Sequence, residues 1–481
     1  MTALPEHRLI VGMECHVQLK TATKCWCACP TSFGAEPNTL VCPTCLGLPG
    51  SMPVLSRGAL DQAIRGGLGL SCTIAAFTKW DRKNYFYPDL PKGYQITQYD
   101  KPLCADGSLA IDGEDGPVTV RVQRAHLEED TGKTTHQPDG TALVDYNRCG
   151  TPLLEIVTHP DIHSAADASA YLEELKRILQ YLGVSDCDME KAQLRCEPNV
   201  NVEVKVGEEW VPTRIVELKN LNSFAAVRNA IEFERTRQIT ELLAGAPRGP
   251  RPKSTRGWDD AKRETYLQRE KEEAADYRYF PEPDLPPVTI AAKRADEIRA
   301  TMPELPRARR DRYVSQLGLS PADAAVLTAT RPLGDWYESV AKSAGDAKLA
   351  ANWTMTYVLR EGFERFPLSA KDFGGFLKAV AKGDIPREAA KSVVFPEMLA
   401  SGRSWQEIVK EKGLSAASAA SLDDVVAKVI ASSADLVEKY KSGKVNILGV
   451  LVGAVMKETR GTADAKTVKD MLERALGSTS A

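Results

Sequence analysis

The chain has 481 residues, of which 43% are hydrophobic and 26% charged, with a formal net charge of −3. This length allows two to four domains, and the balanced charge excludes a uniformly basic nucleic-acid binder while leaving room for a local basic patch. Met1 to Arg8 has no long apolar stretch of the kind found in signal peptides. No apolar run reaches the roughly 18 residues that a membrane-spanning helix needs. We therefore expect a cytoplasmic protein with no membrane segment.

The first predicted element is a strand from Leu9 to Leu19, in which polar and apolar residues alternate. Glu14, His16 and Gln18 share one face of this strand, because successive side chains point to opposite sides. Burying a carboxylate is costly unless it is paired, so Glu14 needs a cation nearby. Glu14 and His16 are therefore candidate metal or substrate contacts. A buried histidine satisfied by a neighbouring acid is the alternative.

Two cysteine pairs follow, Cys27-Ala28-Cys29 and Cys42-Pro43-Thr44-Cys45, with twelve residues between them. Two close pairs of thiolates suit a tetrahedral Zn²⁺ ion, and a closed site of four sulfurs is structural rather than catalytic. We therefore predict a zinc knuckle within residues 25–50. Cys25 could take the place of Cys27. The alternative is a set of incidental reduced cysteines.

The segment from Asp81 to Asp100 combines cations such as Lys83 with aromatic residues such as Tyr87, and prolines and a glycine divide it into loops. Aromatic loops with interspersed charges are typical of surfaces that bind substrates. A long connection packed on the core by its aromatic rings is an equal alternative.

An acidic turn of Glu128, Glu129 and Asp130 follows a predicted strand from Val118 to Leu127. Another carboxylate, Glu155, lies inside the apolar strand Pro152 to Val157. Together with Glu14, these are separate acidic segments that each need a cation. Oxygen ligands favour Mg²⁺, so we predict one shared magnesium site. A solvated acidic turn is the alternative reading of residues 128–130.

A helix is predicted from Ser164 to Leu182, and strands from Leu194 to Val204 and from Ile215 to Lys219. Polar residues, including Arg195 and Lys219, occupy one face of these two strands. This pattern predicts an antiparallel sheet with a polar floor, although a solvated face would show it too. A charged helix over residues 224–244 follows.

After about residue 295 short helical segments dominate, and a second change of character lies near Pro396 to Ser404. We therefore predict an α+β protein with an antiparallel-sheet cradle at residues 1–295 and all-helical domains at 296–403 and 404–481. In the last domain Gly449 and Gly453 leave a smooth stripe on a helix. The stripe would allow close packing inside the bundle, or approach of another backbone or of RNA phosphates.

Seven motifs occur together in order, and each is weak by itself. They are G-M-E-C-H-V-Q-L-K, the cysteine pairs running into C-L-G-L-P-G, D-R-K-N-Y-F-Y-P-D, H-L-E-E-D-T-G-K, N-R-C-G-T-P-L-L-E-I-V, E-L-K-N-L-N-S-F and D-Y-R-Y-F-P-E-P-D-L-P-P. The set resembles the B subunit of the bacterial aspartyl/glutamyl-tRNA amidotransferases, from about residue 9 to the end. Gln18 departs from the family pattern, as does the stretch from Met189 to Asn199.

The resemblance implies one member of a heterotrimeric enzyme that uses ATP and Mg²⁺ to phosphorylate the side-chain carboxyl of misacylated Glu-tRNA(Gln) or Asp-tRNA(Asn). Ammonia released from glutamine by the amidase subunit then displaces the phosphate, and a small third subunit joins the other two. A non-discriminating aminoacyl-tRNA synthetase is a further expected partner. The cradle domain would be catalytic and the tail domain would hold the tRNA.

The resemblance also assigns roles to residues. Glu14, His16, Glu128, Glu129 and Glu155 correspond to Mg²⁺ and active-site positions, with Glu14, His16, Glu129 and Glu155 catalytic. Cys27, Cys29, Cys42 and Cys45 correspond to the zinc knuckle that some members carry. Lys83 and Tyr87 lie in the loop near the ammonia route, and we expect Lys83, Arg195 and Lys219 to contact the nucleotide.

The chain has no Walker-type G-x-x-x-x-G-K-[ST], so its nucleotide site must differ from a P-loop. Two rival functions remain open at the level of sequence. A zinc-dependent RNA-binding protein without catalysis would not need Glu14 and Glu155 in apolar strands. An ATP-dependent ligase for a small carboxylic acid would not need the helical second half.

Overall fold

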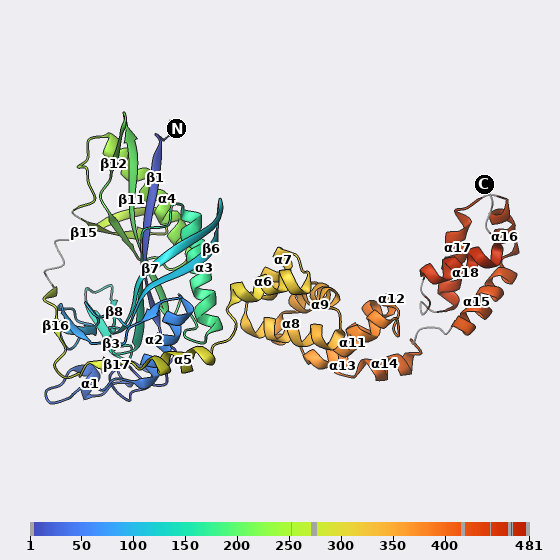
Figure 1. Cartoon of the computed structure of the whole chain (residues 1–481), viewed down its shortest axis with the longest axis horizontal. Coiled ribbons are helices and arrows are strands. Elements are labelled where there is room, and N and C mark those ends of the chain that lie inside the picture. Colours follow the sequence, from blue (N-terminus) through green and yellow to red (C-terminus); the bar gives the residue numbers. More distant parts are fainter. Residues whose placement is uncertain are drawn as a thin grey trace. The chain divides into compact units, whose positions relative to one another are not determined.

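The computed structural model describes residues 4–251, 253–270, 277–414, 419–442, 444–459, 463 and 465–477. The chain divides into two compact units, Met1–Leu305 and Pro306–Ala481. The first unit is built on a large sheet with helices, and the second is helical (Figure 1). This arrangement confirms the predicted α+β class. Within the described residues, no helix is both long enough and apolar enough to cross a membrane.

The first unit contains a ten-stranded sheet. Its strands are β1 (His7–Gln18), β2 (Thr73–Ile74), β6 (Cys104–Gly113), β7 (Gly116–Glu129), β10 (Pro152–Thr158), β11 (Leu194–Val206), β12 (Glu209–Pro212), β13 (Val216–Lys219), β14 (Ser254–Asp259) and β15 (Glu264–Glu270). Their order is β15-β14-β13-β11-β1-β10-β7-β6-β2, and β12 pairs with β11. β1, which begins the sheet in sequence, therefore lies near its middle.

One strand pair differs from the predicted antiparallel sheet, because β13 and β14 run parallel. The helix α4 (Phe224–Leu243) lies between them in sequence. A helical crossover returns the chain to the same end of the sheet, so the next strand runs in the same direction. The other pairs of this sheet are antiparallel.

Three smaller sheets complete the described part of the first unit. They consist of β16 (Phe280–Pro281), β4 (Asp81–Asn84) and β5 (Tyr94–Thr97); of β17 (Val288–Thr289) and β3 (Phe77–Thr78); and of β8 (Lys133–His136) and β9 (Ala142–Asp145). The segment predicted as loops from Asp81 to Asp100 thus forms a hairpin, β4–β5, and β16 from far along the chain pairs with it.

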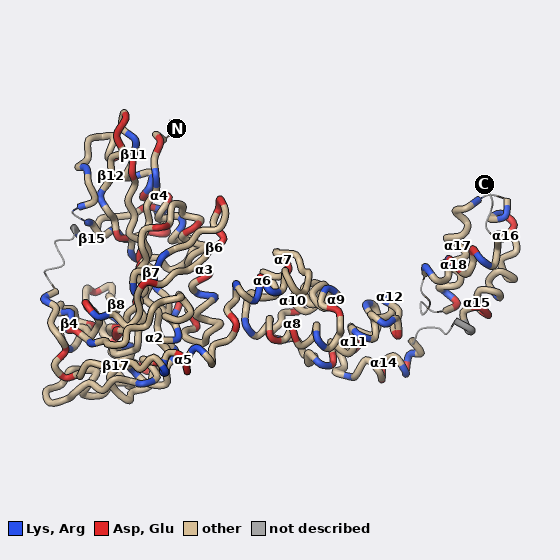
Figure 2. The backbone as a smooth tube through the Cα atoms, viewed as in Figure 1, with Lys and Arg blue, Asp and Glu red and all other residues tan. Residues whose placement is uncertain are grey.

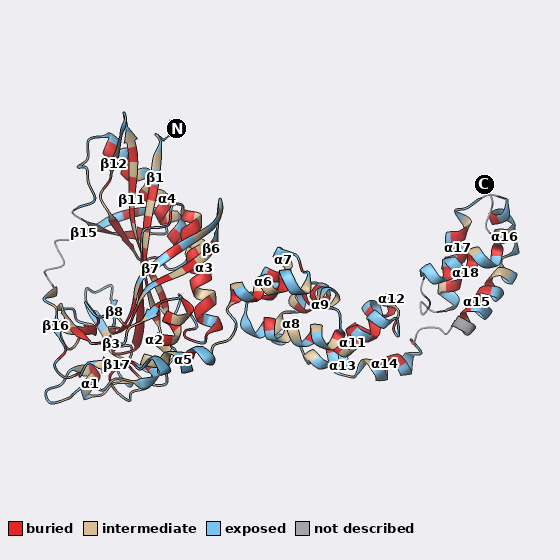
Figure 3. Ribbon diagram, in the orientation of Figure 1, coloured by how far each residue is buried: buried red, intermediate tan, exposed pale blue. Residues whose placement is uncertain are grey.

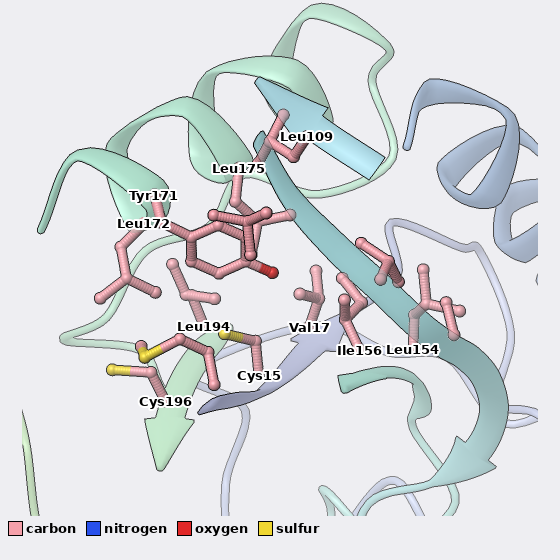
Figure 4. Packing of buried hydrophobic residues seen from close by; sticks show 14 of the residues in the cluster. Cys15, Val17, Leu109, Leu154, Ile156, Tyr171, Leu172, Leu175, Leu194 and Cys196 are labelled. Carbon is pink, nitrogen blue, oxygen red and sulfur yellow. The ribbon is translucent and has the colours of Figure 1, made fainter. Parts of the chain in front are cut away.

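Helices cover one face of the large sheet. They are α2 (Arg57–Gly69), α3 (Ala165–Tyr181) and α4, while α1 (Pro43–Leu46) and α5 (Ala292–Ala300) lie elsewhere in the unit. Tyr171 and Leu175 of α3 pack against Cys15 and Val17 of β1 (Figure 4). Burying each such large side chain stabilises the fold by about 1.5–3 kcal/mol. The opposite face of the sheet is consequently free to carry polar groups.

The helix starts follow from local chemistry. Ser164 accepts a hydrogen bond from the backbone N–H of Asp167, 2.9 Å away, at the start of α3. Ser223 does the same for Ala226 at 3.0 Å, at the start of α4. These N-caps satisfy backbone donors that have no partner inside the helix. The predicted helix 164–182 is confirmed to within a residue at each end.

Burial alternates along β1 and β11, with apolar residues buried and their polar neighbours partly exposed (Figure 3). The pairing register brings His16 opposite Glu155 on one side and opposite Arg195 on the other. Glu155 in turn lies opposite His126 of β7. The polar residues of β7, β10, β1 and β11 therefore form one continuous surface, and Figure 2 shows acidic and basic residues along β7 and β11.

The described residues of the second unit form two hydrophobic cores. The helices of the first core are α6 (Pro306–Leu317), α7 (Pro321–Leu327), α8 (Arg331–Ala344), α9 (Ala347–Trp353), the π-helical turn η2 (Thr354–Val358), α10 (Leu359–Glu361), η3 (Phe363–Arg365), α11 (Ala370–Lys382), α12 (Arg387–Ala389), the π-helical turn η4 (Ala390–Val394), α13 (Phe395–Ser401) and α14 (Trp405–Lys412). Those of the second core are α15 (Ala419–Ser432), α16 (Ala434–Lys441), α17 (Ile447–Glu458) and α18 (Ala465–Leu476).

The boundary expected at residues 403/404 falls between α13 and α14. However, α14 buries Ile408 and Val409 in the first of these cores, together with Leu414 beyond its end. The second core begins at Leu422. The change between the two cores therefore lies after Leu414 rather than before α14.

The glycine stripe of α17 is open in the part of the bundle that the structure describes. A side chain built at Gly449 or Gly453 would meet no other atom within 4 Å. The apolar residues Leu448, Leu451 and Val455 of the same helix are buried. The stripe therefore does not serve packing among the described helices of this core.

Candidate active site and metal centres

The polar surface of the sheet forms the floor of a cavity of about 520 Å³, which we call the cradle cavity. Its floor comes from β1, β7, β10, β11 and β13, and part of its wall comes from the β4–β5 hairpin and Tyr277 and Tyr279. Of the predicted site residues outside the cysteine pairs, those lining this cavity are Glu14, His16, Lys83, Glu128, Glu155, Arg195 and Lys219. Residues from distant segments of the sequence are thus brought together on one surface.

His16 lies at the centre of the acidic residues. Its Nε2 atom is 3.4 Å from Glu14 Oε1, and its Nδ1 atom is 3.5 Å from Glu128 Oε1 and 3.9 Å from Glu155 Oε2. His16, Glu128 and Glu155 each offer a ligand atom, and these atoms lie within 4.8 Å of one another. His16 makes a second such group with Glu14 and Glu197. Both groups have the composition of a divalent-cation site rich in oxygen.

His126 joins this cluster, although we did not expect it among the site residues. Its Nε2 atom is 3.4 Å from Glu155 Oε2 and 3.6 Å from Glu128 Oε2. Its Nδ1 atom is buried and has no hydrogen-bond partner among the described residues. The signal was present in the sequence, because His126 and Glu128 are two residues apart in one strand and share a face.

The histidines and carboxylates of this cluster shift one another's pKa values. Burial by itself would lower the pKa of His126, but Glu155 and Glu128 outweigh it and raise that pKa to about 9. The pKa of His16 is likewise raised, since Glu128 and Glu14 outweigh its burial. The two imidazoles in turn hold the pKa of Glu128 and of Glu155 below the usual range, against the effect of burial. The carboxylates are therefore ionised and need positive charge beside them.

Glu129 differs from our expectation, because it does not face the cradle cavity. β7 extends to Glu129, so the side chains of Glu128 and Glu129 point to opposite faces. Lys92 Nζ lies 2.6 Å from the Glu129 carboxylate, and the backbone N–H of Ile96 donates to Glu129 Oε1 at 2.9 Å. These groups line a separate small cavity of about 60 Å³ beside Cys27 and Cys45.

The three predicted nucleotide contacts have different surroundings. Arg195 donates to Asp130 Oδ1 at 2.9 Å, and Lys219 Nζ lies 2.5 Å from Glu197 Oε2 and 3.1 Å from Glu217 Oε1. For Lys83, the structure gives ring contacts: its Nζ atom lies 4.9 Å from the centre of the Tyr277 ring and 5.9 Å from that of Tyr85. Tyr279, with Glu128 and Glu155, raises the pKa of Lys83 against the effect of its burial. Lys83 thus places a fixed positive charge in the cavity.

Aromatic rings form the rim of the cradle cavity. Tyr99 and Tyr279 are stacked with their centres 4.3 Å apart, and Tyr277 contacts both Tyr279 and Tyr85 edge to face. Tyr87 is 60% exposed and is not among the cavity-lining residues. Stacked rings on a rim are suited to holding a planar base or to excluding water.

The cysteine pairs form a separate centre. The sulfur atoms of Cys27, Cys29, Cys42 and Cys45 all lie within 4.8 Å of one another and could hold a metal ion. A tetrahedral zinc site with Zn–S bonds of about 2.3 Å has sulfurs about 3.8 Å apart. The Cys42 and Cys45 sulfurs are 3.8 Å apart. A hydrogen bond from the Cys27 thiol lowers the pKa of Cys45 to about 4, which favours a thiolate there.

Cys25, the sequence alternative to Cys27, belongs instead to the hydrophobic core of the first unit. It is fully buried, and the backbone around it is fixed by hydrogen bonds to Gly150 and Ser56. The knuckle is shaped by α1, whose first residue is Pro43 and whose N-cap is Cys42. Gly47 ends it with a positive φ of 67°, a conformation that glycine adopts without strain.

Comparison with known proteins decides the family. A model of the GatB/GatE catalytic domain matches residues 9–296, and a model of the GatB domain matches residues 335–476. The chain belongs to the GatB family. The resemblance seen in the sequence motifs is thereby confirmed over nearly its whole length.

Curated GatB relatives agree with this assignment, and their names describe the B subunit of aspartyl/glutamyl-tRNA(Asn/Gln) amidotransferase. The relative from Carboxydothermus hydrogenoformans is 48% identical over 98% of this chain and 99% of its own. The relative from Caldanaerobacter subterraneus is 46% identical with the same coverage, and that from Rhodopirellula baltica is 44% identical over 96% of this chain and 95% of its own. This GatB chain is accordingly a subunit of an enzyme, an amidotransferase.

Proposed function

We propose that this chain activates the side-chain carboxyl of misacylated Glu-tRNA(Gln), Asp-tRNA(Asn) or both, by transferring the γ-phosphoryl group of ATP to it. The observation that carries the proposal is the cluster of His16, Glu128 and Glu155 in a cavity that also holds Lys83 and Arg195. Ammonia then attacks the acyl phosphate, the amide forms, and inorganic phosphate leaves. The products are Gln-tRNA(Gln) and Asn-tRNA(Asn).

Phosphoryl transfer needs charge neutralisation and positioning rather than a covalent nucleophile. A Mg²⁺ ion held by His16, Glu128 and Glu155 would supply the neutralising charge, and Glu14 lies 3.4 Å from the other side of the His16 ring. Lys83, Arg195 and Lys219 line the same cavity and can pair with phosphate oxygens. The aromatic rim of Tyr99 and Tyr279 can keep water from the reactive acyl phosphate.

The remaining parts of the proposal follow from the family. The chain would act in the cytoplasm within a heterotrimer, together with an amidase subunit that releases ammonia from glutamine and a small third subunit. A non-discriminating synthetase would supply the misacylated tRNA. The last helical core, from α15 onward, would hold the body of the tRNA. We further propose that the four cysteines bind Zn²⁺ with a structural role, since all four ligand positions would be filled by protein.

The test uses the complete heterotrimer with Glu155→Gln, which keeps the shape of the side chain and removes its charge. Loss of an electrostatic contact used in the transition state typically lowers the rate by roughly 10²- to 10³-fold. Amidation of each misacylated tRNA is measured with glutamine and with ammonia supplied directly. Basal glutamine hydrolysis should persist, because it occurs on another polypeptide of the heterotrimer.

The matched control is Glu203→Gln, the same substitution on β11 at a partly exposed position outside the cradle cavity. Near wild-type amidation by Glu155→Gln with ammonia would refute the proposed metal centre. Tight tRNA binding without ATP turnover in the wild-type heterotrimer would favour the zinc-dependent RNA-binding protein. Amidation of free glutamate would favour the ligase for small acids.

A further inference from the structure

A second hollow of about 410 Å³ lies beside the cradle cavity, and we call it the edge pocket. Segments far apart in sequence line it, among them the loop that contains Phe33, the turn that contains Arg148, and the turn that contains Lys191. Its volume lies in the range of small-molecule sites, roughly 300–1,000 Å³. Neither the metal cluster nor the cysteine centre uses it.

The edge pocket continues the polar face of the same central strands. On β1, His16 lines the cradle cavity and Gln18, two residues on, lines the edge pocket. On β11, Arg195 lines the cavity, and Gln193, just before the strand, lines the pocket. Residues two apart in a strand share a face and are separated by roughly 7 Å. The two hollows are thus consecutive sites along one surface.

Asp130 forms the wall between them. It lines the cradle cavity and is buried, while Gln18 Nε2 donates to its Oδ2 at 2.9 Å from the side of the edge pocket. Arg195 donates to its Oδ1 at 2.9 Å from the side of the cradle cavity. Arg148 Nε also lies 3.6 Å from Asp130 Oδ2, so two guanidinium groups face this buried carboxylate. The wall is therefore a fixed ionic unit, shared by both sites.

The edge pocket offers an aromatic ring and cations. Phe33 is 70% exposed, although burying such a ring would normally stabilise the fold. Lys191 Nζ lies 5.8 Å from the centre of the Phe33 ring, and Lys133 also lines the pocket. An exposed ring flanked by lysines is the arrangement with which proteins bind single-stranded nucleic acid, stacking a base on the ring and pairing phosphate with the cation.

Other charges in the pocket are already engaged. Arg148 donates to the backbone carbonyls of Thr131 at 2.9 Å and Gly132 at 2.6 Å, so its role is structural. Asp145 accepts hydrogen bonds from the backbone N–H groups of Asn38 and Asn147. Lys191 Nζ lies 3.0 Å from Asp188 Oδ2, but this pair is at the surface, where water and salt screen it and a phosphate can compete for the lysine. Lys133 and Lys191 are therefore the groups that can meet phosphates, opposed by the exposed Glu190.

We propose that the edge pocket binds the unpaired 3′-terminal nucleotides of the tRNA, with a base stacked on Phe33 and phosphates beside Lys133 and Lys191. This inference rests on the proposed function. The amino acid is esterified to the terminal ribose, so a side-chain carboxyl at Glu128 and Glu155 requires the terminal nucleotides to lie in a neighbouring hollow. The edge pocket adjoins the cavity on the same face, and the lysines and arginine of the cradle cavity remain for ATP.

The experiment measures how tightly the complete heterotrimer binds two RNAs, and compares the wild type with Phe33→Ala. One RNA is an uncharged acceptor-stem hairpin with its intact unpaired 3′ end, and the other lacks the bases of its last nucleotides. Removing the bases should weaken binding to the wild-type heterotrimer by roughly 5- to 100-fold, the range of one or two stacking contacts. The same removal should change binding to Phe33→Ala by less than about twofold, because the stacking ring is gone.

Phe33→Tyr keeps a ring and should behave like the wild type, and Phe77→Ala, at an exposed ring outside both hollows, is the control. Lys133→Ala and Lys191→Ala should each reduce the salt dependence of hairpin binding. Equal sensitivity of Phe33→Ala and wild type to removal of the bases would overturn the proposal. So would a raised KM for ATP with unchanged hairpin affinity, since the pocket would then hold the adenine of ATP. The binding readout needs no catalysis, so its failure is separable from failure of the proposed reaction.

Discussion

Glu128 and Glu129 are adjacent in β7, yet their carboxylates lie on opposite faces of the sheet. Glu128 accepts a hydrogen bond from Thr97 Oγ1 at 2.8 Å and lies 3.5 Å from His16. Glu129 pairs with Lys92 beside the cysteine centre. One residue step along a strand thus separates a carboxylate of the cradle cavity from a carboxylate of a buried ion pair.

Because the two carboxylates have different partners, replacing each with glutamine should affect a different property: metal affinity for Glu128 and stability for Glu129. Glu128→Gln should weaken binding of Mn²⁺, used as a paramagnetic substitute for Mg²⁺, by at least about tenfold, because it removes one charged ligand. Glu129→Gln should leave Mn²⁺ affinity within about twofold of the wild type. It should instead lower the free energy of unfolding by about 3 kcal/mol, because it leaves Lys92 buried without its partner.

Metal titrations and urea unfolding of both variants check this prediction. Lys92→Met serves as the matched variant, since it removes the other half of the pair. If Glu129→Gln loses Mn²⁺ binding while Lys92→Met retains it, Glu129 is a metal ligand after all.

The sequence predicted most of the polar surface because strand alternation is a local property. Glu14 and His16 share a face of β1, and Arg195 and Lys219 project into the same cavity. The exception, Glu129, arose because the predicted strand ended at Leu127, whereas β7 continues the alternation for two more residues. The pairing with Lys92 depends on a hairpin more than thirty residues earlier, and no local pattern reveals it.

Long-range packing limited the rest of the prediction. The parallel pair β13–β14 results from the crossover through α4. Alternation of polar and apolar residues identifies a strand but does not show whether it pairs parallel or antiparallel with its neighbour. The helix α14 was grouped with the tail because the sequence changes character before it, but its Ile408 and Val409 pack in the core of α6–α13. A short amphipathic helix shows that it needs an apolar partner without showing which one.

The cysteine quartet predicts about one zinc ion per chain. Cys42→Ser and Cys45→Ser should each lower the zinc content of the reduced protein severalfold and lower its thermal midpoint, because a structural site contributes folding free energy. Elemental analysis after dialysis against a weak chelator measures the zinc.

Cys25→Ala is the control, since Cys25 is close in sequence but lies in the hydrophobic core. Its zinc content should equal that of the wild type. A wild-type chain that contains no zinc after reduction and gentle purification would contradict the zinc proposal and leave the cradle cavity unaffected.

The position of α14 determines where the tail can be removed. A chain ending at Leu414 keeps the core of α6–α14, whereas a chain ending at residue 403 exposes the apolar groups that α14 covers. We expect the longer truncation product to assemble and to bind charged tRNA more weakly, with a smaller salt dependence than the full chain. The product ending at 403 should be less stable by a few kcal/mol, since two buried aliphatic residues lose their partners.

Filter binding at several salt concentrations and urea unfolding measure the two effects. Gly449→Ala and Gly453→Ala test whether the open stripe of α17 contributes, because an added methyl group meets no other described atom within 4 Å and should not disturb the bundle. Unchanged tRNA affinity in the chain ending at Leu414 would exclude a tRNA-binding role for the last core.

The charge on His126 predicts a pH dependence of stability in the metal-free protein. The pKa of His126 in the folded chain is raised to about 9 by Glu155 and Glu128, above the ordinary value of about 6.5. A raised folded-state pKa stabilises the fold fully below about pH 6.5, and this contribution is lost as the pH rises through about 9. At about 1.4 kcal/mol per pKa unit, the difference between about 6.5 and about 9 corresponds to a loss of at most about 3.5 kcal/mol.

The free energy of unfolding, measured with urea in EDTA at pH 6.5, 7.5 and 9, should therefore fall more for the wild type than for His126→Gln. Excess Mg²⁺ should reduce the wild-type loss, because the ion supplies the positive charge that the imidazole gives up and binds better once its ligands are deprotonated. His136→Gln, at an exposed histidine on β8, controls for general effects of pH. If wild type and His126→Gln lose the same stability between pH 6.5 and 9, the imidazole does not carry the charge that holds Glu128 and Glu155 together.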